Sequence, residues 1–467
     1  MTGNSFFWYD FETSGLHPGS DRPLQFGGIR TDLQLNPIDD PVVLFAQLTP
    51  DVLPHPDACL MTGITPESIA DRSLRECDFI DGIQREFSRP LTCVLGYNSL
   101  RFDDEVTRYT LFRNLMDPYS REWRHGNSRW DIIPLARMTR ALRPEGINWP
   151  KDPLGVPSLR LDQLTRANQI SHEAAHDALS DVWATIGLAR LIRSHQPRLF
   201  DYLFAHRGKQ AALNLLAPGQ WRPMLHASTR YPMAQSQLGL IAAIALHPHR
   251  SNVVIAFDLS FHPKVLAEKA TLSEGMPGSR QALLTIKVNQ CPALAPLSVL
   301  RPKDAERLAI DPDLCLSHLT LLQEVDVLKS PQAQSLLEQA TSRSPKDPDL
   351  SLYEGFLKDK DRQNLDQFRQ LPPEAMGAAR LTFEDPRVPE MIFRFRARNY
   401  PETLNAEERT RWQDFCRNRL LGHDAGEGLT LKDFESRLNE WSLREDLTAS
   451  QREILEALRR AGARCQA

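Results

Sequence analysis

FFWYDFETSG, residues 6–15, has the aromatic enrichment of a buried β-strand, and Gly15 ends it. Residues two apart on a strand share a face, so Asp10 and Glu12 project together near the carboxyl end of the strand, where α/β sheets place their sites. Two carboxylates this close repel each other, and a divalent cation such as Mg²⁺ or Mn²⁺ removes that repulsion. Most Asp-x-Glu pairs lie on a solvated turn, so a metal site here depends on further acidic residues elsewhere in the chain.

The composition is that of a globular protein with several domains. The chain has 467 residues, 41% of them hydrophobic and 25% charged, which predicts two or three domains. No secretory signal is expected, because acidic residues interrupt the apolar start, and the longest apolar run, 238–246, is too short to span a membrane. The seven cysteines are scattered without a C-x-x-C pair, which fits a reducing compartment. We therefore expect a cytoplasmic protein.

Further elements follow the first strand. Strands are expected at 25–31, 42–48 and 91–97. A helix is expected to begin at Pro66, with Thr65 as its N-cap.

The fourth strand leads to a helix that begins with Asp103, Asp104 and Glu105. Acidic residues in a first helical turn commonly compensate the helix dipole. The alternative is that one of them completes the metal site.

Arginine and aromatic residues are interleaved between positions 108 and 143. The set comprises Arg108, Tyr109, Tyr119, Arg121, Trp123, Arg124, Arg129, Trp130, Arg137, Arg140 and Arg143. Aromatic faces stack on bases and arginines contact phosphates, a combination typical of a channel for a single strand. A charged helix face backed by core aromatics gives the same pattern, and this stretch alone leaves both interpretations open.

The segment SHEAAHDALSD, residues 171–181, supplies the last candidates. Asp177 is the expected N-cap of a helix whose apolar residues recur at three- and four-residue spacing. His176 then lies just before the helix and Asp181 inside it. A histidine at such an edge can reach a water molecule, and histidine ordinarily titrates near neutral pH.

Asp10 and Glu12, then Asp103, then His176 with Asp181 stand in the chain order of the DEDDh class of 3′→5′ exonucleases, which the sequence resembles. Within that class the sequence is similar to the bacterial exodeoxyribonuclease I family over essentially its full length. The resemblance rests on FFWYDFETSG, LGYNSLRFDDEVTR, NSRWD, ALRPEGINWP, AHDALSDVWAT and QPRLFDYLF, with LRPKDAERL and FRFRARNYPETL further on.

The motif LGYNSLRFDDEVTR leaves one choice of metal ligand open. The general pattern of the class spaces its Asn and Asp slightly more tightly than Asn98 and Asp103 stand here. Asp104 therefore stays an alternative ligand, although the Phe-Asp pair favours Asp103.

The resemblance implies an α/β ribonuclease H-like exonuclease domain with a mixed sheet, an SH3-like β-barrel domain and a C-terminal helical domain. The expected bounds are 1–196, 197–345 and 346–467. The residues themselves predict strands at 239–246, 252–259 and 283–289, then helices from 303 to about 340 and again from about 349.

The resemblance also implies an activity, namely 3′→5′ hydrolysis of single-stranded DNA to 5′-mononucleotides, in DNA repair and recombination. Two Mg²⁺ ions, which Mn²⁺ can replace, would be held by Asp10, Glu12, Asp103 and Asp181, with His176 as general base. Substrate contacts would come from Glu12, Thr13, Arg108, Tyr119, Trp123, Arg137 and Arg160.

A protein partner is implied as well. The family binds the acidic, hydrophobic C-terminal tail of single-stranded DNA-binding protein, and the matching positions are Arg143, Tyr202, Arg222 and Arg301. Gln323 stands where the family's basic ridge carries a further arginine, so we expect somewhat weaker electrostatic attraction.

Two other functions stay open. An RNA-trimming or proofreading DEDDh nuclease would share the acidic set, but the two additional domains argue against it. A non-catalytic nucleic-acid-binding scaffold would be marked by loss of an acidic ligand, and none of the expected five residues is missing. Nothing in the sequence demands more than a monomer.

Overall fold

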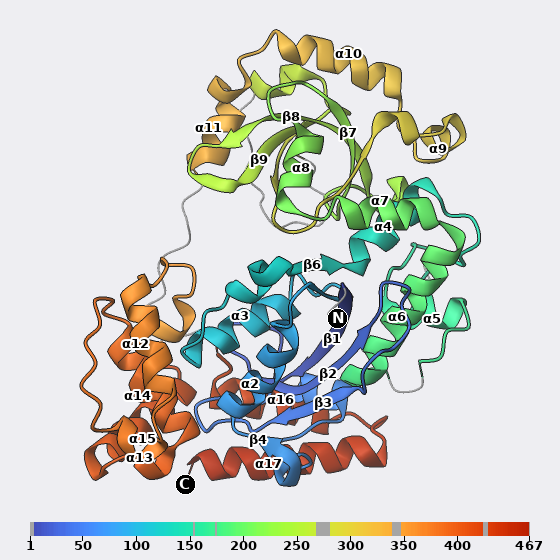
Figure 1. Cartoon of the computed structure of the whole chain (residues 1–467). Coiled ribbons are helices and arrows are strands. Elements are labelled where there is room, and N and C mark those ends of the chain that lie inside the picture. The colour runs from blue at the N-terminus through green and yellow to red at the C-terminus, as the bar shows by residue number, and fades with distance from the viewer. Residues whose placement is uncertain are drawn as a thin grey trace.

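The computed structural model describes residues 4–152, 155–172, 175–267, 281–338, 347–423 and 428–466. It has three parts (Figure 1): an α/β part in blue to green, a β-rich part above it, and a helical part in orange to red beside and beneath the first. No described helix combines the length and the apolar character needed to cross a bilayer.

The first part is built on a six-stranded mixed sheet with the order β4-β3-β2-β1-β5-β6. The strands are β1 (Ser5–Thr13), β2 (Pro23–Thr31), β3 (Val42–Ala46), β4 (Ser73–Leu74), β5 (Thr92–Gly96) and β6 (Ser128–Asp131). β1 pairs antiparallel with β2 and parallel with β5. The strands predicted at 6–15, 25–31, 42–48 and 91–97 are confirmed.

β1 lies inside the sheet because both of its faces are apolar. Phe6 and Trp8 enter one buried cluster, and Phe7, Tyr9 and Phe11 enter another on the opposite face. A strand covered on both faces reads as a continuous apolar run, as this one does.

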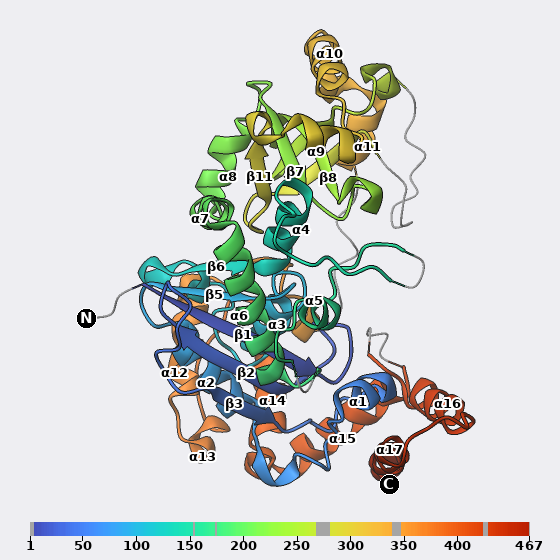
Figure 2. The ribbon, with the colours of Figure 1, turned by 90° about the vertical axis from the view of Figure 1, so that its right-hand side faces the viewer.

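Helices cover both faces of this sheet. The helices of this part are α1 (Pro56–Thr62), α2 (Glu76–Phe87), α3 (Asp103–Arg113), α4 (Ile132–Leu142), α5 (Leu161–Ala167) and α6 (Ala178–His195). α6 lies across β1 and β2 on the face of Phe6 and Trp8 (Figure 2), whereas α2 and α3 supply the opposite cluster.

The prediction of a helix beginning at Pro66 is wrong. α1 ends earlier, and Gly63 caps it in the left-handed region at φ 74°. Thr65 and Ser68 then accept each other's backbone N–H, at 3.1 and 3.0 Å. These side-chain bonds close a single turn and satisfy the donors that would have started a helix.

The second part begins with α7 (Pro197–Ala205) and α8 (Lys209–Leu216). Its five-stranded antiparallel sheet has the order β10-β9-β8-β7-β11, formed by β7 (Pro223–Ala227), β8 (Leu238–His247), β9 (Arg250–Asp258), β10 (Leu283–Lys287) and β11 (Ala293–Pro296). α9 (Pro302–Arg307), α10 (Pro312–Gln323) and α11 (Pro331–Glu338) follow. The three predicted strands are confirmed as β8, β9 and β10, whereas β7 and β11 were not predicted.

The third part is helical, as expected. Its helices are α12 (Asp359–Arg369), α13 (Pro373–Met376), α14 (Val388–Asn399), α15 (Ala406–Leu420), α16 (Leu431–Ser442) and α17 (Ala449–Gln466). The predicted boundary at 345/346 lies outside the described residues.

A buried network of charges joins the third part to the first. Arg398 of α14 lies 3.0 Å from Asp51 and 2.5 Å from Asp349, and Arg22, which directly precedes β2, lies 3.2 Å from the same Asp51. All four side chains are at most 2% exposed. Removing one member would leave a buried charge without its partner, so the network holds α14 firmly against the sheet that carries the site.

Candidate active site

Four carboxylates converge at the carboxyl end of β1. Asp10 and Glu12 project from the face that α6 covers, the same side as Phe6 and Trp8. Asp103 is the first residue of α3, and its Oδ1 accepts the backbone N–H of Phe11 at 3.2 Å. Asp181 lies in the first turn of α6.

These carboxylates disfavour one another's charged forms. Burial, together with the neighbouring Asp181 and Asp103, raises the pKa of Glu12 to about 9. Burial likewise raises the pKa of Asp10 and of Asp103 well above the usual range. It also raises the pKa of Asp181, although hydrogen bonding to His172 opposes the rise. A divalent cation would relieve this repulsion and favour the charged forms.

The geometry favours Asp103 over Asp104 as the ligand from α3. The Asp104 carboxylate accepts hydrogen bonds from Tyr9 Oη at 2.8 Å, Arg121 at 2.7 Å and Arg129 at 2.5 Å. Burial alone would raise the pKa of Asp104, but the two arginines hold it well below its ordinary value. The negative charge of Asp104 is therefore balanced by arginines inside the protein, whereas the charge of Asp103 repels that of Asp10 and raises its pKa.

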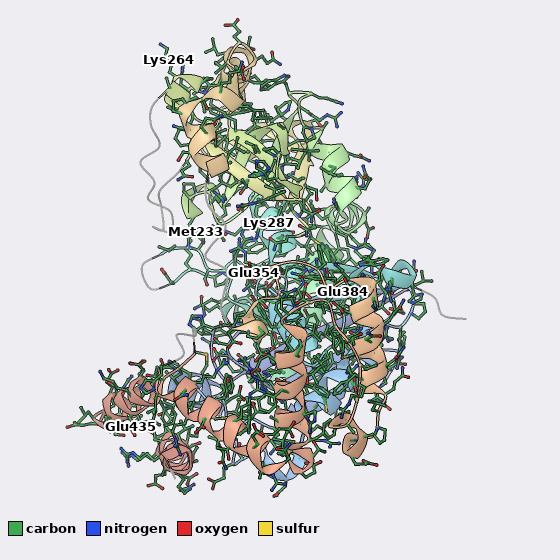
Figure 3. The ribbon with its side chains drawn as sticks, turned by 90° about the vertical axis from the view of Figure 1, so that its left-hand side faces the viewer. Met233, Lys264, Lys287, Glu354, Glu384 and Glu435 are labelled. Carbon is green, nitrogen blue, oxygen red and sulfur yellow. The ribbon has the colours of Figure 1, made fainter. Side chains whose placement is uncertain are left out.

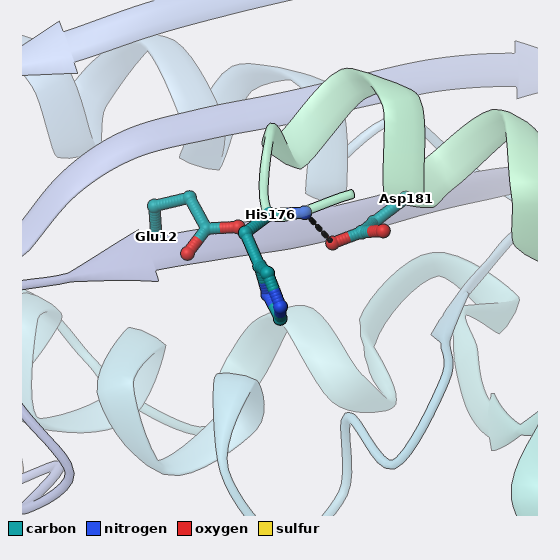
Figure 4. A group of neighbouring side chains, drawn as sticks. All are labelled: Glu12, His176 and Asp181. Atoms are coloured by element: carbon teal, nitrogen blue, oxygen red, sulfur yellow. Dashed lines mark hydrogen bonds between the residues drawn. The ribbon is translucent and has the colours of Figure 1, made fainter. Parts of the chain in front are cut away.

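Figure 4 shows His176 between Glu12 and Asp181. One potential ligand atom of each residue lies within 4.8 Å of the other two. His176 adopts φ 68°, and its backbone N–H donates to Asp181 Oδ2 at 3.2 Å. Carboxylate oxygens with one imidazole nitrogen nearby fit a divalent cation.

The helix expected after His176 is confirmed. Asp177 caps α6 by accepting the backbone N–H of Ser180 at 3.1 Å. The cap fixes the first turn of the helix and with it the position of Asp181.

His172 contacts Asp181 directly and was not predicted as a site residue. His172 Nε2 lies 2.5 Å from Asp181 Oδ1, and its Nδ1 lies 3.1 Å from Thr165 Oγ1 of α5. The available signal was its spacing of four residues before His176. His172 therefore helps to orient the Asp181 carboxylate.

β2 positions the beginning of α6 through two residues that were also missed. Gln25 donates to Asp177 Oδ2 at 2.7 Å and accepts the backbone N–H of Ala178 at 3.3 Å. Gly27 pairs with Asp10 in the sheet, and a Cβ there would lie 2.4 Å from the backbone nitrogen of Leu179. Only glycine allows the helix to come this close.

Gly27→Ala is expected to displace the start of α6 and to lower the hydrolysis rate by ~10²-fold, since misplacement by about 1 Å costs that much. Overpacking should also cost ~1–3 kcal/mol of stability. Rate measurements and thermal unfolding check this. Gly208→Ala is the control, because nothing lies within 4 Å of its Cβ position. A Gly27→Ala variant with the rate and melting temperature of the unmodified protein would contradict the packing argument.

Glu12→Gln is expected to stabilise the metal-free protein at high pH. The pKa of Glu12 is about 9 in the fold against 4.5 ordinarily, so the folded state binds the proton more tightly. Glu12 therefore lowers the free energy of unfolding progressively as pH rises from about 4.5 towards 9. At about pH 5 this loss is still small. The variant should melt higher in chelator at about pH 8, by ~2–4 °C per kcal/mol relieved.

Melting curves in chelator at both pH values check this prediction. Excess Mg²⁺ should then stabilise the unmodified protein more than the variant, because only the former keeps all four carboxylates. An equal effect of the substitution at both pH values would contradict it.

The structure places the expected DNA-contacting residues at different depths. Trp123 is 63% exposed, and Arg160 is an exposed side chain 3.1 Å from Asp162. Tyr119 is half-buried. Thr13 is buried and donates to the Gly15 carbonyl at 2.6 Å.

Two further expected contact residues are buried and paired within the protein. Arg108 is buried and lies 2.6 Å from Glu105 and 2.8 Å from Glu122. Arg137 is buried and donates to Gln237 Oε1 at 2.7 Å.

The residues expected to bind a protein partner are brought together in part. Arg143 and Arg301 both donate to the carbonyl of Leu142, at 2.6 and 3.0 Å. The Tyr202 hydroxyl is buried without a hydrogen-bond partner among the described residues, and Arg222 and Gln323 are exposed. No hydrogen bond or ion pair between described residues joins Tyr202 or Arg222 to the Arg143–Arg301 pair, although Tyr202 packs against the cluster that contains Leu142.

Three family models match the chain, described as Exonuclease over residues 7–189, Exonuclease I SH3-like domain over 207–336 and Exonuclease I C-terminal domain over 346–463. The exodeoxyribonuclease I of Haemophilus influenzae is 41% identical over 429 residues, which cover 89% of this chain and 90% of that protein.

Solved structures match over almost the full length. Exonuclease I from Methylocaldum szegediense is 48% identical, with a TM-score of 0.93 and 100% of both chains covered. Escherichia coli exonuclease I in complex with a dA16 oligonucleotide is 37% identical, with a TM-score of 0.93 and 99% and 100% covered. A structure of SSB/exonuclease I in complex with the inhibitor CFAM is 37% identical, with a TM-score of 0.91 and 99% and 100% covered.

Proposed function

The chain belongs to the bacterial exodeoxyribonuclease I family, and we propose from this membership that it shortens single-stranded DNA from the 3′ end and releases 5′-mononucleotides. It is an exonuclease with the family's three domains, a ribonuclease H-like mixed-sheet domain, an SH3-like domain and a C-terminal helical domain. The observation that carries the proposal is the convergence of Asp10, Glu12, Asp103 and Asp181 within the exonuclease domain. Bounds of 1–196, 197–345 and 346–467 remain our proposal.

Two divalent cations, Mg²⁺ or in its place Mn²⁺, held by these four carboxylates would supply a bound water of lowered pKa and neutralise charge at the scissile phosphate. His176 would accept a proton from the attacking water. The new bond joins the water oxygen to phosphorus, and the bond to the 3′ oxygen of the shortened strand breaks. The released nucleotide keeps the phosphate at its 5′ position.

The substrate residues support binding of a single strand. We propose that Trp123 and Tyr119 stack on bases and that Arg160 meets a phosphate, with Glu12 and Thr13 against the terminal nucleotide. Arg108 and Arg137 would line the path as well. The complex of Escherichia coli exonuclease I with an oligonucleotide supports this substrate class. A role in DNA repair and recombination, a cytoplasmic location and a monomeric state complete the proposal.

The test is incubation with a 5′-labelled single-stranded DNA, with and without Mg²⁺, beside a blunt duplex and an RNA of the same sequence. Metal-dependent shortening from the 3′ end, with mononucleotides released and the duplex spared, is the expected result. Preference for the RNA would indicate a trimming nuclease. Binding without shortening under any divalent metal would indicate a scaffold.

We also propose that the acidic C-terminal tail of single-stranded DNA-binding protein binds near Arg143 and Arg301. The solved SSB/exonuclease I structure supports a partner of this kind. The Arg143 side chain is 28% exposed, so its guanidinium is accessible to a carboxylate of the tail.

Arg143→Ala is expected to weaken binding of the tail peptide by about tenfold or more, the equivalent of one charge-assisted hydrogen bond. Hydrolysis of DNA without the partner should stay unchanged. Peptide titration by fluorescence anisotropy measures the first effect, with Arg452→Ala, an exposed arginine of α17, as control. Unaltered peptide affinity in Arg143→Ala would count against this docking site.

A further inference from the structure

His172 is a buried histidine that contacts a proposed metal ligand without belonging to the ligand set. Its side chain is 6% exposed, and its two ring nitrogens lie against Asp181 of α6 and Thr165 of α5. Among the described residues, the possible ligands that come together are Glu12, His176 and Asp181. His172 can therefore act on a cation through the orientation that it gives to Asp181.

Thr165 determines which nitrogen of His172 carries a hydrogen. The single hydroxyl hydrogen of Thr165 is directed to the carbonyl oxygens of Leu161 and Asp162, 3.0 and 3.1 Å away in the same helix. The Thr165 oxygen therefore accepts in its 3.1 Å contact with His172, and Nδ1 of the ring is the donor. Thr165 is 1% exposed, so this bond is shielded from water and holds Nε2 towards Asp181.

The chain just before His172 is anchored to both helices. The Ile170 N–H donates to the Thr165 carbonyl at 2.9 Å, which closes the turn after α5. The Ile170 side chain packs over Gly187 of α6, where a Cβ would lie 2.5 Å from it. Packing and hydrogen bonds of the protein therefore fix the His172 ring, without any contribution from a cation.

The two carboxylate oxygens of Asp181 have different partners. Oδ1 lies 2.5 Å from His172 Nε2, and Oδ2 accepts the backbone N–H of His176 at 3.2 Å. In Figure 4 the oxygen that is bonded to His176 is the one on the side of Glu12. Because the imidazole engages Oδ1, Asp181 offers one oxygen, Oδ2, to a cation between itself and Glu12.

The number of oxygens that a carboxylate offers discriminates between cations. Mg²⁺ demands near-ideal octahedral geometry with short bonds, whereas Ca²⁺ accepts more ligands and often takes both oxygens of one carboxylate. We propose that His172, oriented by Thr165, restricts Asp181 to one cation-facing oxygen and so makes the site select Mg²⁺ over Ca²⁺. His172 is then a positioning residue that determines cation specificity. The inference rests on the proposed function, because it concerns the cation site of that activity.

Cation binding to the protein without DNA tests this specificity directly. Mg²⁺ and Ca²⁺ are each titrated against bound Mn²⁺, whose release is followed by electron paramagnetic resonance. His172→Leu should bind Mg²⁺ about 10- to 100-fold more weakly, the usual cost of removing a residue that supports a metal ligand. The affinity for Ca²⁺ should change by only a few-fold, because the freed Oδ1 of Asp181 can join Oδ2 on the larger ion.

Thr165 supplies a matched pair of variants that leave the imidazole in place. Thr165→Val removes the hydroxyl that accepts from His172 and should shift the specificity towards Ca²⁺, as His172→Leu does. Thr165→Ser keeps the hydroxyl and should bind both cations as the unmodified protein does. The control is His262→Leu, at an exposed histidine of the β-rich part that accepts the backbone N–H of Lys264 at 3.1 Å. Figure 3 shows Lys264 at the far end of that part.

Melting curves in chelator establish that each variant is folded, and Thr165→Val decides the question if His172→Leu does not fold. An equal loss of affinity for Mg²⁺ and Ca²⁺, a shift towards Mg²⁺, or unchanged affinity for both would overturn the role of His172. Failure of the unmodified protein to shorten DNA in Mg²⁺ would overturn the proposed function instead. The cation specificity, measured without DNA, would still stand or fall by its own titration.

Discussion

Asp181→Asn is expected to abolish hydrolysis, with a fall in rate of ~10⁴-fold or more. Asparagine keeps the shape of the side chain but removes a negative charge from a cluster whose four carboxylates would together hold the cations. The loss should exceed the ~10²–10³-fold typical of a single neutral group that stabilises charge. Binding of single-stranded DNA should persist, because the arginine and aromatic residues of the path are untouched.

Release of mononucleotide measures the rate, and anisotropy with a labelled oligomer measures binding. Asp201→Asn is a matched control, since Asp201 of α7 is 64% exposed and lies 3.8 Å from Arg193, outside the site. A near-normal rate in Asp181→Asn would remove this residue from the metal site. Lost binding together with lost hydrolysis would indicate a misfolded variant instead.

His176→Ala is expected to lower the rate by ~10²–10⁴-fold, the usual contribution of a general base. The residue lies within 4.8 Å of ligand atoms of both Glu12 and Asp181, so its imidazole is close to any water bound there. Substrate affinity should change little, because His176 is not among the expected substrate contacts.

The measurement is single-turnover hydrolysis with and without added imidazole, which should restore part of the rate to His176→Ala. His249→Ala, an exposed histidine between β8 and β9, is the control and should behave as the unmodified protein. Loss of less than about tenfold, without rescue by imidazole, would argue that His176 is not the base.

Much of the site was predictable because it depends on local pattern. The aromatic-rich stretch 6–15 predicted β1, and the two-residue spacing placed Asp10 and Glu12 on one face. Asp177 as N-cap predicted where α6 begins and therefore where Asp181 lies. Each of these inferences needs only residues within one element.

Other features depended on residues distant in the chain. The choice between Asp103 and Asp104 follows from Arg121, Arg129 and Tyr9 surrounding Asp104, none of which is adjacent to it in sequence. Gln25 is 152 positions from Asp177, and no local pattern indicates that it holds the start of α6.

The sequence by itself therefore determined the strand, the acidic residues and the family, because periodicity, capping and motif spacing are properties of short segments. Only the tertiary structure decided that arginines balance the charge of Asp104 and that α6 packs closely against Gly27. It also decided that the Phe356 ring contacts the Tyr119 ring. These outcomes depend on packing between elements, where a shift of one ångström changes which charged groups pair and which rings touch.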